Sequence, residues 1–192
     1  MATSSAAPPP YGREQHDLGP GPDGGARALR PLQAGEEQVL GAALAAIDPW
    51  AAYRSSSAGL ARVLAAREDG AVRRAIVIGD RLAGIVIVRW PWLAGPYLQL
   101  LAVLPDHAGR GIGSAVLDWM AAEAPAGTRN LWLCVSAPNI RARRFYERHG
   151  FALAATLPAL AADHIDELLL RKRLDALALD RDQGAGLRPG AS

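Results

Sequence analysis

Cysteine is nearly absent from this chain: among 192 residues there is one, Cys134. A single cysteine excludes an internal disulfide framework and suits a reducing compartment. Long apolar runs are also missing, because no stretch approaches the roughly 20 residues that a membrane-spanning helix needs. The first residues lack the apolar core of a signal peptide. We therefore expect a cytoplasmic protein that does not bind membranes.

The chain also lacks an excess of either charge sign, because 21 Lys and Arg residues and 19 Asp and Glu residues leave a formal net charge of +2. The arginines are spread among the acids and form no dense basic stripe, so no nucleic-acid partner is expected. The four histidines show no metal-ligand spacing, so no metal is expected either.

The chain does contain enough apolar residues for one good core. Of its 192 residues 50% are hydrophobic, which predicts a single domain. Residues 1–26 are rich in Pro, Gly, Ala and Ser without periodicity, and we predict a disordered N-terminal tail that adds little to stability. Residues 27–175 form the predicted domain, and residues 176–192 form a flexible C-terminal tail.

Hydrophobic periodicity predicts alternating strands and helices between these tails. A strand at 98–104, a helix at 112–123 and a strand at 131–135 form a βαβ unit, whose strands are expected to be parallel with a right-handed crossover. The other predicted strands lie at 28–32, 75–78, 82–88, 152–156 and 164–173, and the other helices lie at 36–47, 58–67 and from Asn139 to Gly150. These elements predict an α/β domain with a mixed sheet.

A glycine-rich turn lies inside the βαβ unit, in the segment Leu98–Ser114 (LQLLAVLPDHAGRGIGS). A strand that feeds such a turn at the start of a helix leaves several backbone N–H groups unpaired, and these groups bind phosphate oxygens together with the helix dipole. The turn is not a P-loop, because no lysine follows Gly113. It is not the dinucleotide-binding fingerprint, because Ser114 stands at the third glycine position. The turn therefore predicts a phosphate site of another kind.

A second segment, NIRARRFYERHGF at residues 139–151, completes a pattern with this turn. Together the two segments resemble the GNAT superfamily of N-acetyltransferases, and the resemblance spans about residues 27–174. It implies a single GNAT-like domain with a mixed, mostly antiparallel sheet, flanked by helices and containing a splayed parallel strand pair. It also implies acetyl-coenzyme A (acetyl-CoA) as cosubstrate, with its pyrophosphate on the glycine turn. Ala108 departs from the family, which usually has Gln or Arg there.

The resemblance places the cosubstrate on two stretches of main chain and one side chain. The pantetheine arm would fill the gap between the splayed strands and bond to backbone near Leu101 and Val103. Asn139 would add a side-chain bond or serve as a helix N-cap, and the two interpretations stay open. The predicted cofactor-binding residues are Leu101, Ala102, Val103, Gly109, Arg110, Gly111, Ile112, Gly113, Ser114 and Asn139.

Tyr146 is the predicted catalytic residue. A phenol with a pKa of about 10 stays protonated at neutral pH and can donate a proton to a departing thiolate. The resemblance implies the same role, because the family's tyrosine on this helix lies beside the coenzyme sulfur. Adjacent helical positions face different ways, so the neighbouring Phe145 is expected in the core.

The base that deprotonates the amine is not identified from the sequence. The strand at 98–104 carries no Glu or Asp, so a water chain that ends at Asp48, Glu147 or His164 stays open. A covalent acetyl-cysteine at Cys134 is rejected, because no histidine stands beside this residue in the sequence to activate it.

These observations predict an acetyl-CoA-dependent N-acetyltransferase that moves an acetyl group to a primary amine by direct attack on the thioester. The acceptor is a small molecule or a peptide, and homodimerisation is left open. One alternative is a protein N-terminal acetyltransferase resembling those that modify ribosomal-protein alanine. Another is a non-catalytic acyl-CoA-binding sensor, whose cleft would be plugged by residues 90–97. Five aromatic residues either line an acceptor pocket or pack the core: Trp50, Tyr53, Trp90, Trp92 and Tyr97.

Overall fold

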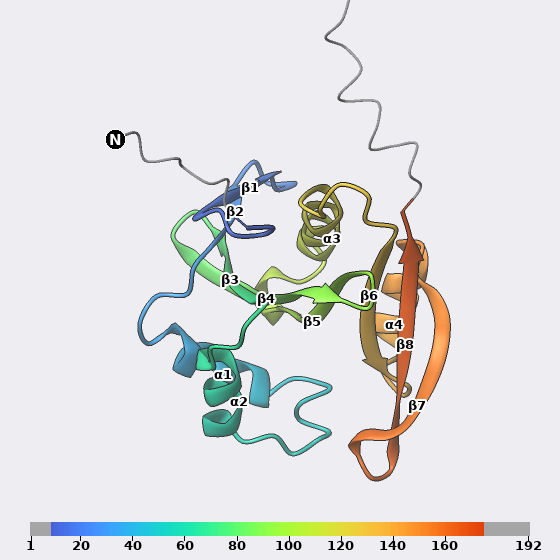
Figure 1. Ribbon diagram of the computed structural model, residues 1–192. Coiled ribbons are helices and arrows are strands. Elements are labelled where there is room, and N and C mark those ends of the chain that lie inside the picture. Colours follow the sequence, from blue (N-terminus) through green and yellow to red (C-terminus); the bar gives the residue numbers. More distant parts are fainter. Residues whose placement is uncertain (1–8, 175–192) are drawn as a thin grey trace, which may run out of the picture.

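Eight strands form one sheet in the order β1-β2-β3-β4-β5-β6-β8-β7 in the computed structural model, which describes residues 9–174 (Figure 1). All neighbours in this range are antiparallel except β5 and β6, which are parallel. The strands are β1 (His16–Pro20), β2 (Ala26–Arg30), β3 (Ala71–Ile78), β4 (Arg81–Trp92), β5 (Gly95–Val103), β6 (Asn130–Ser136), β7 (Ala152–Ala162) and β8 (Ile165–Arg173). The predicted mixed, mostly antiparallel sheet is confirmed.

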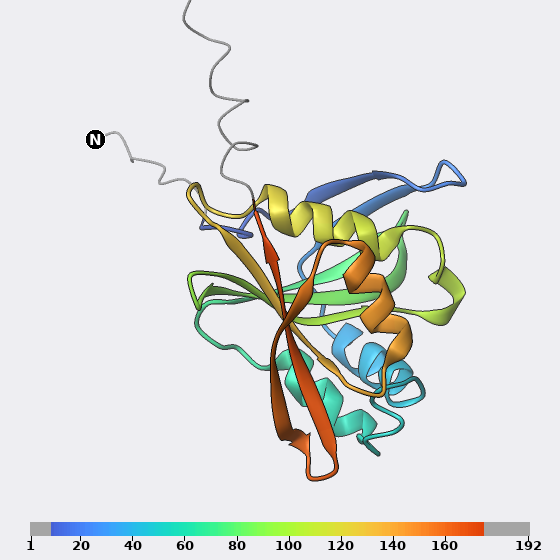
Figure 2. The same ribbon diagram turned by 90° about the vertical axis from the view of Figure 1, so that its right-hand side faces the viewer.

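Helices cover both faces of this sheet, as the two views in Figures 1 and 2 show. Successive side chains of a strand point to opposite faces. Along β4, therefore, Val86 and Val88 pack on the α3 and α4 side, whereas Ile85 and Ile87 pack on the α1 and α2 side. The helices are α1 (Glu36–Ala45), α2 (Ser57–Ala65), α3 (Ile112–Ala122) and α4 (Ile140–Arg148), with a short 3₁₀ turn at Pro105–His107. None of these described helices is long and apolar enough to cross a bilayer.

The parallel strands β5 and β6 separate along their length. With α3 between them they form the predicted βαβ unit, but their pairing ends at Leu98 and Leu133, although β5 continues to Val103 and β6 to Ser136. At the other end Gly95 approaches β6 so closely that a Cβ there would collide with a main-chain carbonyl oxygen. The sheet is therefore closed at the start of this pair and open at its carboxyl end.

The segment before β2 is more ordered than the sequence predicts. Of the expected tail at residues 1–26, the part from 16 to 20 forms β1 and pairs with β2, so the prediction of disorder is wrong there. Tyr11 is completely buried, and its Oη donates a hydrogen bond to the carbonyl of Met120 at 2.8 Å. A five-residue strand containing Gly and Pro is too short to give a periodic signal. Residues 1–8 and the predicted tail at 176–192 lie outside the described residues.

Replacing Tyr11 with alanine is expected to lower the free energy of unfolding by about 3–5 kcal/mol, the usual cost of emptying a large buried aromatic site. Tyr11→Phe keeps the ring and loses the hydrogen bond to Met120, so about 1 kcal/mol is expected. Urea unfolding followed by circular dichroism measures both values. Wild-type stability in the alanine variant would show that the segment before β1 does not dock on the domain in solution.

Candidate active site

A cavity of about 300 Å³ lies where β5 and β6 separate. Trp50 and Tyr53 line it from the connection between α1 and α2, whereas Asn139 and Tyr146 line it from α4 and the residue before it. These two groups belong to opposite faces of the sheet. The cavity therefore passes through the gap between the strands, and groups from both faces can meet within it.

Tyr146 of α4 reaches this cavity from the α3 and α4 face. Its side chain is buried, and this burial raises the pKa of Tyr146 to about 12, so the phenol is protonated at neutral pH. The neighbouring Phe145 points elsewhere and packs against α3 at Gly113, where a Cβ would lie 2.9 Å from the ring. The two aromatic residues thus face different neighbours, but Tyr146 is the one that belongs to the buried core and Phe145 is only partly buried, so the expectation that Phe145 takes the core position is not confirmed.

Asn139 has one of its two predicted roles, that of the N-cap of α4, and its bond to the coenzyme stays a prediction. Its Oδ1 accepts a hydrogen bond from the backbone N–H of Ala142 at 3.0 Å, which caps the start of α4. The residue also lines the cavity, and its Nδ2 donates to no partner among the described residues. The amide group is thus fixed by one atom and available through the other.

The glycine turn at residues 109–111 leads into α3 with a row of unpaired donors. Gly109 and Gly111 adopt positive φ angles of 77° and 73°, which glycine reaches without a steric cost. Gly111 is the N-cap of α3 and supplies no side-chain cap. Among the described residues, the backbone N–H groups from Gly109 to Ser114 donate to no carbonyl. This set of donors at a helix N-terminus is an anion site by its geometry.

The other predicted cofactor-binding residues fall into different environments. Leu101 lines the cavity, whereas Ala102 packs toward α1 and α2 and Val103 toward α3. Ile112 is buried in the core and offers a ligand only its backbone. The Oγ of Ser114 lies 2.9 Å from Nε2 of His149, which ties the start of α3 to the end of α4.

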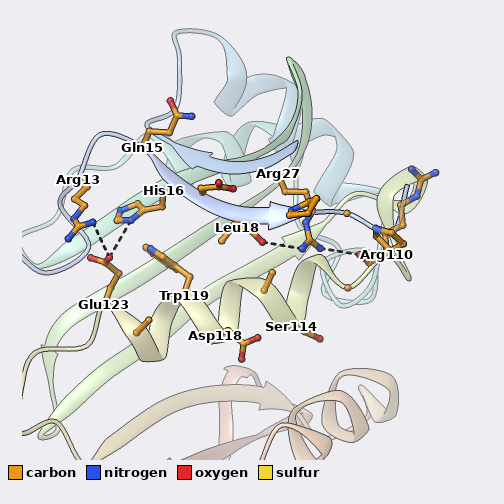
Figure 3. A pocket seen from close by; sticks show the side chains of 17 residues that line it. Arg13, Gln15, His16, Leu18, Arg27, Arg110, Ser114, Asp118, Trp119 and Glu123 are labelled. Atoms are coloured by element: carbon orange, nitrogen blue, oxygen red, sulfur yellow. Dashed lines mark hydrogen bonds and ion pairs between the residues drawn. The ribbon is translucent and has the colours of Figure 1, made fainter. Parts of the chain in front are cut away.

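Arg110 is engaged by the β1–β2 hairpin (Figure 3). Its Nη1 lies 3.2 Å from a carboxylate oxygen of Asp23, with both side chains about half exposed. Arg27 of β2 donates to the carbonyls of Leu18 and Gly19 and, at 3.3 Å, to the carbonyl of Arg110. The hairpin therefore contacts the glycine turn on the side away from the gap between β5 and β6.

A larger cavity of about 890 Å³ lies between this hairpin and α3, lined by the labelled residues of Figure 3. Within it Glu123 lies 4.0 Å from Nη1 of Arg13 and 3.6 Å from Nδ1 of His16. Tyr146 and the gap between β5 and β6 take no part in it. The smaller cavity is thus the candidate active site, although it has less volume.

Glu167 of β8 is a site residue that the sequence analysis missed. It pairs in register with Ser136 at the end of β6, lines the cavity and is 8% exposed. Tyr53 Oη donates to its Oε1 at 2.6 Å. Burial raises the pKa of Glu167, and the hydrogen bond from Tyr53 partly opposes this shift. One sequence signal was available: an acid directly before the apolar run 168–170 in the strand predicted at residues 164–173.

The base candidates named from the sequence lie elsewhere. Asp48, Glu147 and His164 are exposed and do not line the cavity. Cys134 does line it, but burial raises the pKa of its thiol, which disfavours a nucleophilic thiolate.

The five predicted aromatic residues divide between the two proposed uses. Trp50, Tyr53 and Tyr97 line the cavity. Trp90 packs against the core, and Trp92 stacks on Tyr97 with ring centroids 4.6 Å apart. Residues 90–97 thus form part of the wall and leave the cavity open.

Comparison with known proteins agrees with this geometry. The model of the acetyltransferase (GNAT) family matches residues 42–151. An acetyltransferase from Thermus thermophilus is similar in fold, with a TM-score of 0.61 and 20% identity over 77% of this chain and 97% of that one. The ribosomal-protein-S18-alanine N-acetyltransferase from Escherichia coli gives 0.57 and 21% over 78% and 94%. No curated protein matches significantly.

Proposed function

This chain belongs to the GNAT acetyltransferase family, and on that premise we propose that it is an acetyl-CoA-dependent N-acetyltransferase acting on a primary amine. One observation carries the proposal: a cavity runs through the sheet between β5 and β6, with Tyr146 on one side and Glu167 on the other. Such a passage lets a thioester and an amine meet from opposite faces. We place the reaction in the cytoplasm, where a lone free cysteine stays reduced.

The coenzyme is held mainly by main chain. The unpaired N–H groups from Gly109 to Ser114 suit its pyrophosphate. Beyond Leu98 the edge of β5 has no partner on β6 and suits the amide groups of the pantetheine arm near Leu101 and Val103. Because these donors belong to the backbone, the site does not depend on a side chain at Ala108. Arg110 can contribute once it leaves Asp23.

Tyr146 supplies the proton for the departing sulfur. The amine nitrogen attacks the thioester carbonyl carbon, a C–N bond forms and the C–S bond breaks. The sulfur takes the phenolic proton, and the proton that the nitrogen loses on becoming an amide restores the phenol. The surroundings that raise the pKa of Tyr146 to about 12 also disfavour an unprotonated thiolate beside it. The transferred proton therefore removes a buried charge from the leaving group.

An enzyme is favoured over a non-catalytic acyl-CoA sensor by the state of the acceptor side. A sensor would have this side plugged, whereas the cavity of about 300 Å³ extends to Trp50, Tyr97 and Glu167. A protein N-terminal acetyltransferase stays within the proposed activity as the peptide form of the acceptor.

The proposal predicts thiol release from acetyl-CoA that depends on both the protein and an added primary amine. Release is followed with a thiol reagent across a panel of amines, and calorimetry with coenzyme A measures binding separately. Reactions without amine give the hydrolysis background. Coenzyme binding without turnover on any amine would leave the sensor, and absence of binding would remove the coenzyme site.

A further inference from the structure

We infer that the acceptor is a small primary amine with one positive charge and an apolar body, and that Glu167 receives its ammonium group. This inference rests on the proposed acetyltransferase function. The acceptor end of the cavity is walled by aromatic and aliphatic side chains, among them Trp50, Tyr97 and Leu160. Within the described lining Glu167 is the sole carboxylate, and Lys, Arg and His are absent.

Glu167 is positioned to bind an ammonium group and then accept its proton. Tyr53 occupies Oε1, which leaves Oε2 for a ligand. Ser136, opposite in the β6–β8 register, is buried and lines the same cavity, where it lies beside the Tyr53 hydroxyl. The free carboxylate oxygen suits a primary ammonium group, which has several N–H donors. Transfer of one proton to Glu167 frees the nitrogen lone pair and leaves both groups neutral.

The same lining disfavours two common classes of amine. The carboxylate of an amino acid would lie near Glu167 with no cation to pair with it. The second ammonium group of a diamine would be desolvated against Trp50, Leu160 and their apolar neighbours without a partner. An unpaired charge in such surroundings is strongly unfavourable.

A peptide N-terminus is also disfavoured. The Tyr53–Glu167 hydrogen bond joins the α1–α2 connection to β8 across the acceptor side, and the two residues are 114 positions apart. An extended peptide needs partners for its own amides, but Gln99, a polar residue of the wall, already accepts from Arg89 at 3.3 Å. The whole cavity, with the part beside Leu101 and Tyr146 included, has about 300 Å³, which is at the lower end of ligand sites. These features favour a compact acceptor.

Matched pairs of amines test the inference directly. Phenethylamine and phenylalanine differ by one carboxylate, and hexylamine and hexamethylenediamine differ by one ammonium group. We expect kcat/KM to be about 10²-fold higher for the first member of each pair, because an uncompensated charge is costly in the cavity. A short peptide that begins with alanine is expected to react more slowly than phenethylamine. A preference for phenylalanine, for the diamine or for the peptide would overturn the inference and leave the acetyltransferase function standing.

Glu167→Gln tests the role of the carboxylate. It is expected to lower kcat/KM for phenethylamine about 10²-fold, with the Kd of coenzyme A unchanged. Asp163→Asn makes the same charge change at an exposed position of the β7–β8 turn and should have no effect. Unchanged turnover by Glu167→Gln would remove Glu167 from the acceptor site. Circular dichroism checks that each variant folds.

The pH profile gives a readout that does not depend on Glu167→Gln folding. Because burial raises the pKa of Glu167, the acid limb of kcat/KM should lie above the ordinary range for a glutamate. Tyr53→Phe removes a hydrogen bond that lowers this pKa, so the limb should move to higher pH. An acid limb that Tyr53→Phe leaves in place would assign it to another group. If the wild-type protein acetylates none of the amines, the result would instead count against the acetyltransferase function itself.

Discussion

Gly111→Val is expected to abolish binding of coenzyme A. Gly111 has a φ of 73° and is the N-cap of α3 in the row of unpaired N–H groups. A β-branched side chain there both strains the turn and covers the donors that the pyrophosphate needs to approach. Calorimetry with coenzyme A should show binding in the wild type and none in the variant.

A matched glycine separates the loss of the site from simple backbone strain. Gly127 has a φ of 80° and open space around it, but it lies in the turn after α3, away from the donors. Gly127→Val should carry the same strain, about 1–3 kcal/mol, and retain coenzyme binding. Gly113 is a poorer test, because a Cβ there meets the Phe145 ring at 2.9 Å and would disturb helix packing. Normal affinity in a folded Gly111→Val protein would move the coenzyme off this turn.

Tyr146→Phe is expected to lower kcat by about 10²–10⁴-fold, the usual range for the loss of a positioned proton donor. The ring and its contacts with Phe151 are retained, so the Kd of coenzyme A should not change. A fall in kcat and kcat/KM together, with binding unchanged, is the signature of an interaction made in the transition state. The measurement uses acetyl-CoA and an acceptor from the amine panel.

Tyr11→Phe is the control for this variant. Tyr11 is also a buried phenol whose pKa is raised by its surroundings, but it hydrogen-bonds to Met120 far from the gap. Loss of the Tyr11 hydroxyl should lower the free energy of unfolding and leave kcat unchanged. If Tyr146→Phe behaves like Tyr11→Phe and keeps its kcat, then Tyr146 is a packing residue.

The part of the site that sequence analysis predicts is the part made by contiguous chain. The turn at residues 109–114 and the strand before it follow one another, and their chemistry belongs to the main chain, so glycine spacing reveals it. The different directions of Phe145 and Tyr146 follow from helical geometry alone. The βαβ order likewise fixes the parallel pairing of β5 and β6.

The part that sequence analysis misses depends on contacts between distant segments. Glu167 is one of two adjacent acids in β8, and only its hydrogen bond with Tyr53, 114 positions away in the sequence, distinguishes it from Asp166. The order of the segment before β2 is not predicted for a similar reason, because the hydrogen bond that holds Tyr11 goes to Met120, 109 positions away in the sequence. Local periodicity carries no information on such partners.

The separation of β5 and β6 has a thermodynamic consequence. Beyond Leu98 and Leu133 the two strands withhold from each other hydrogen bonds that a continuous ladder would form. Under the proposed function a bound coenzyme takes up this withheld capacity and acts as a missing length of strand. The same main-chain groups then contribute both to coenzyme binding and to the stability of the fold. The protein saturated with coenzyme should therefore have a higher free energy of unfolding than the free protein, by an amount set by the coenzyme concentration relative to its Kd.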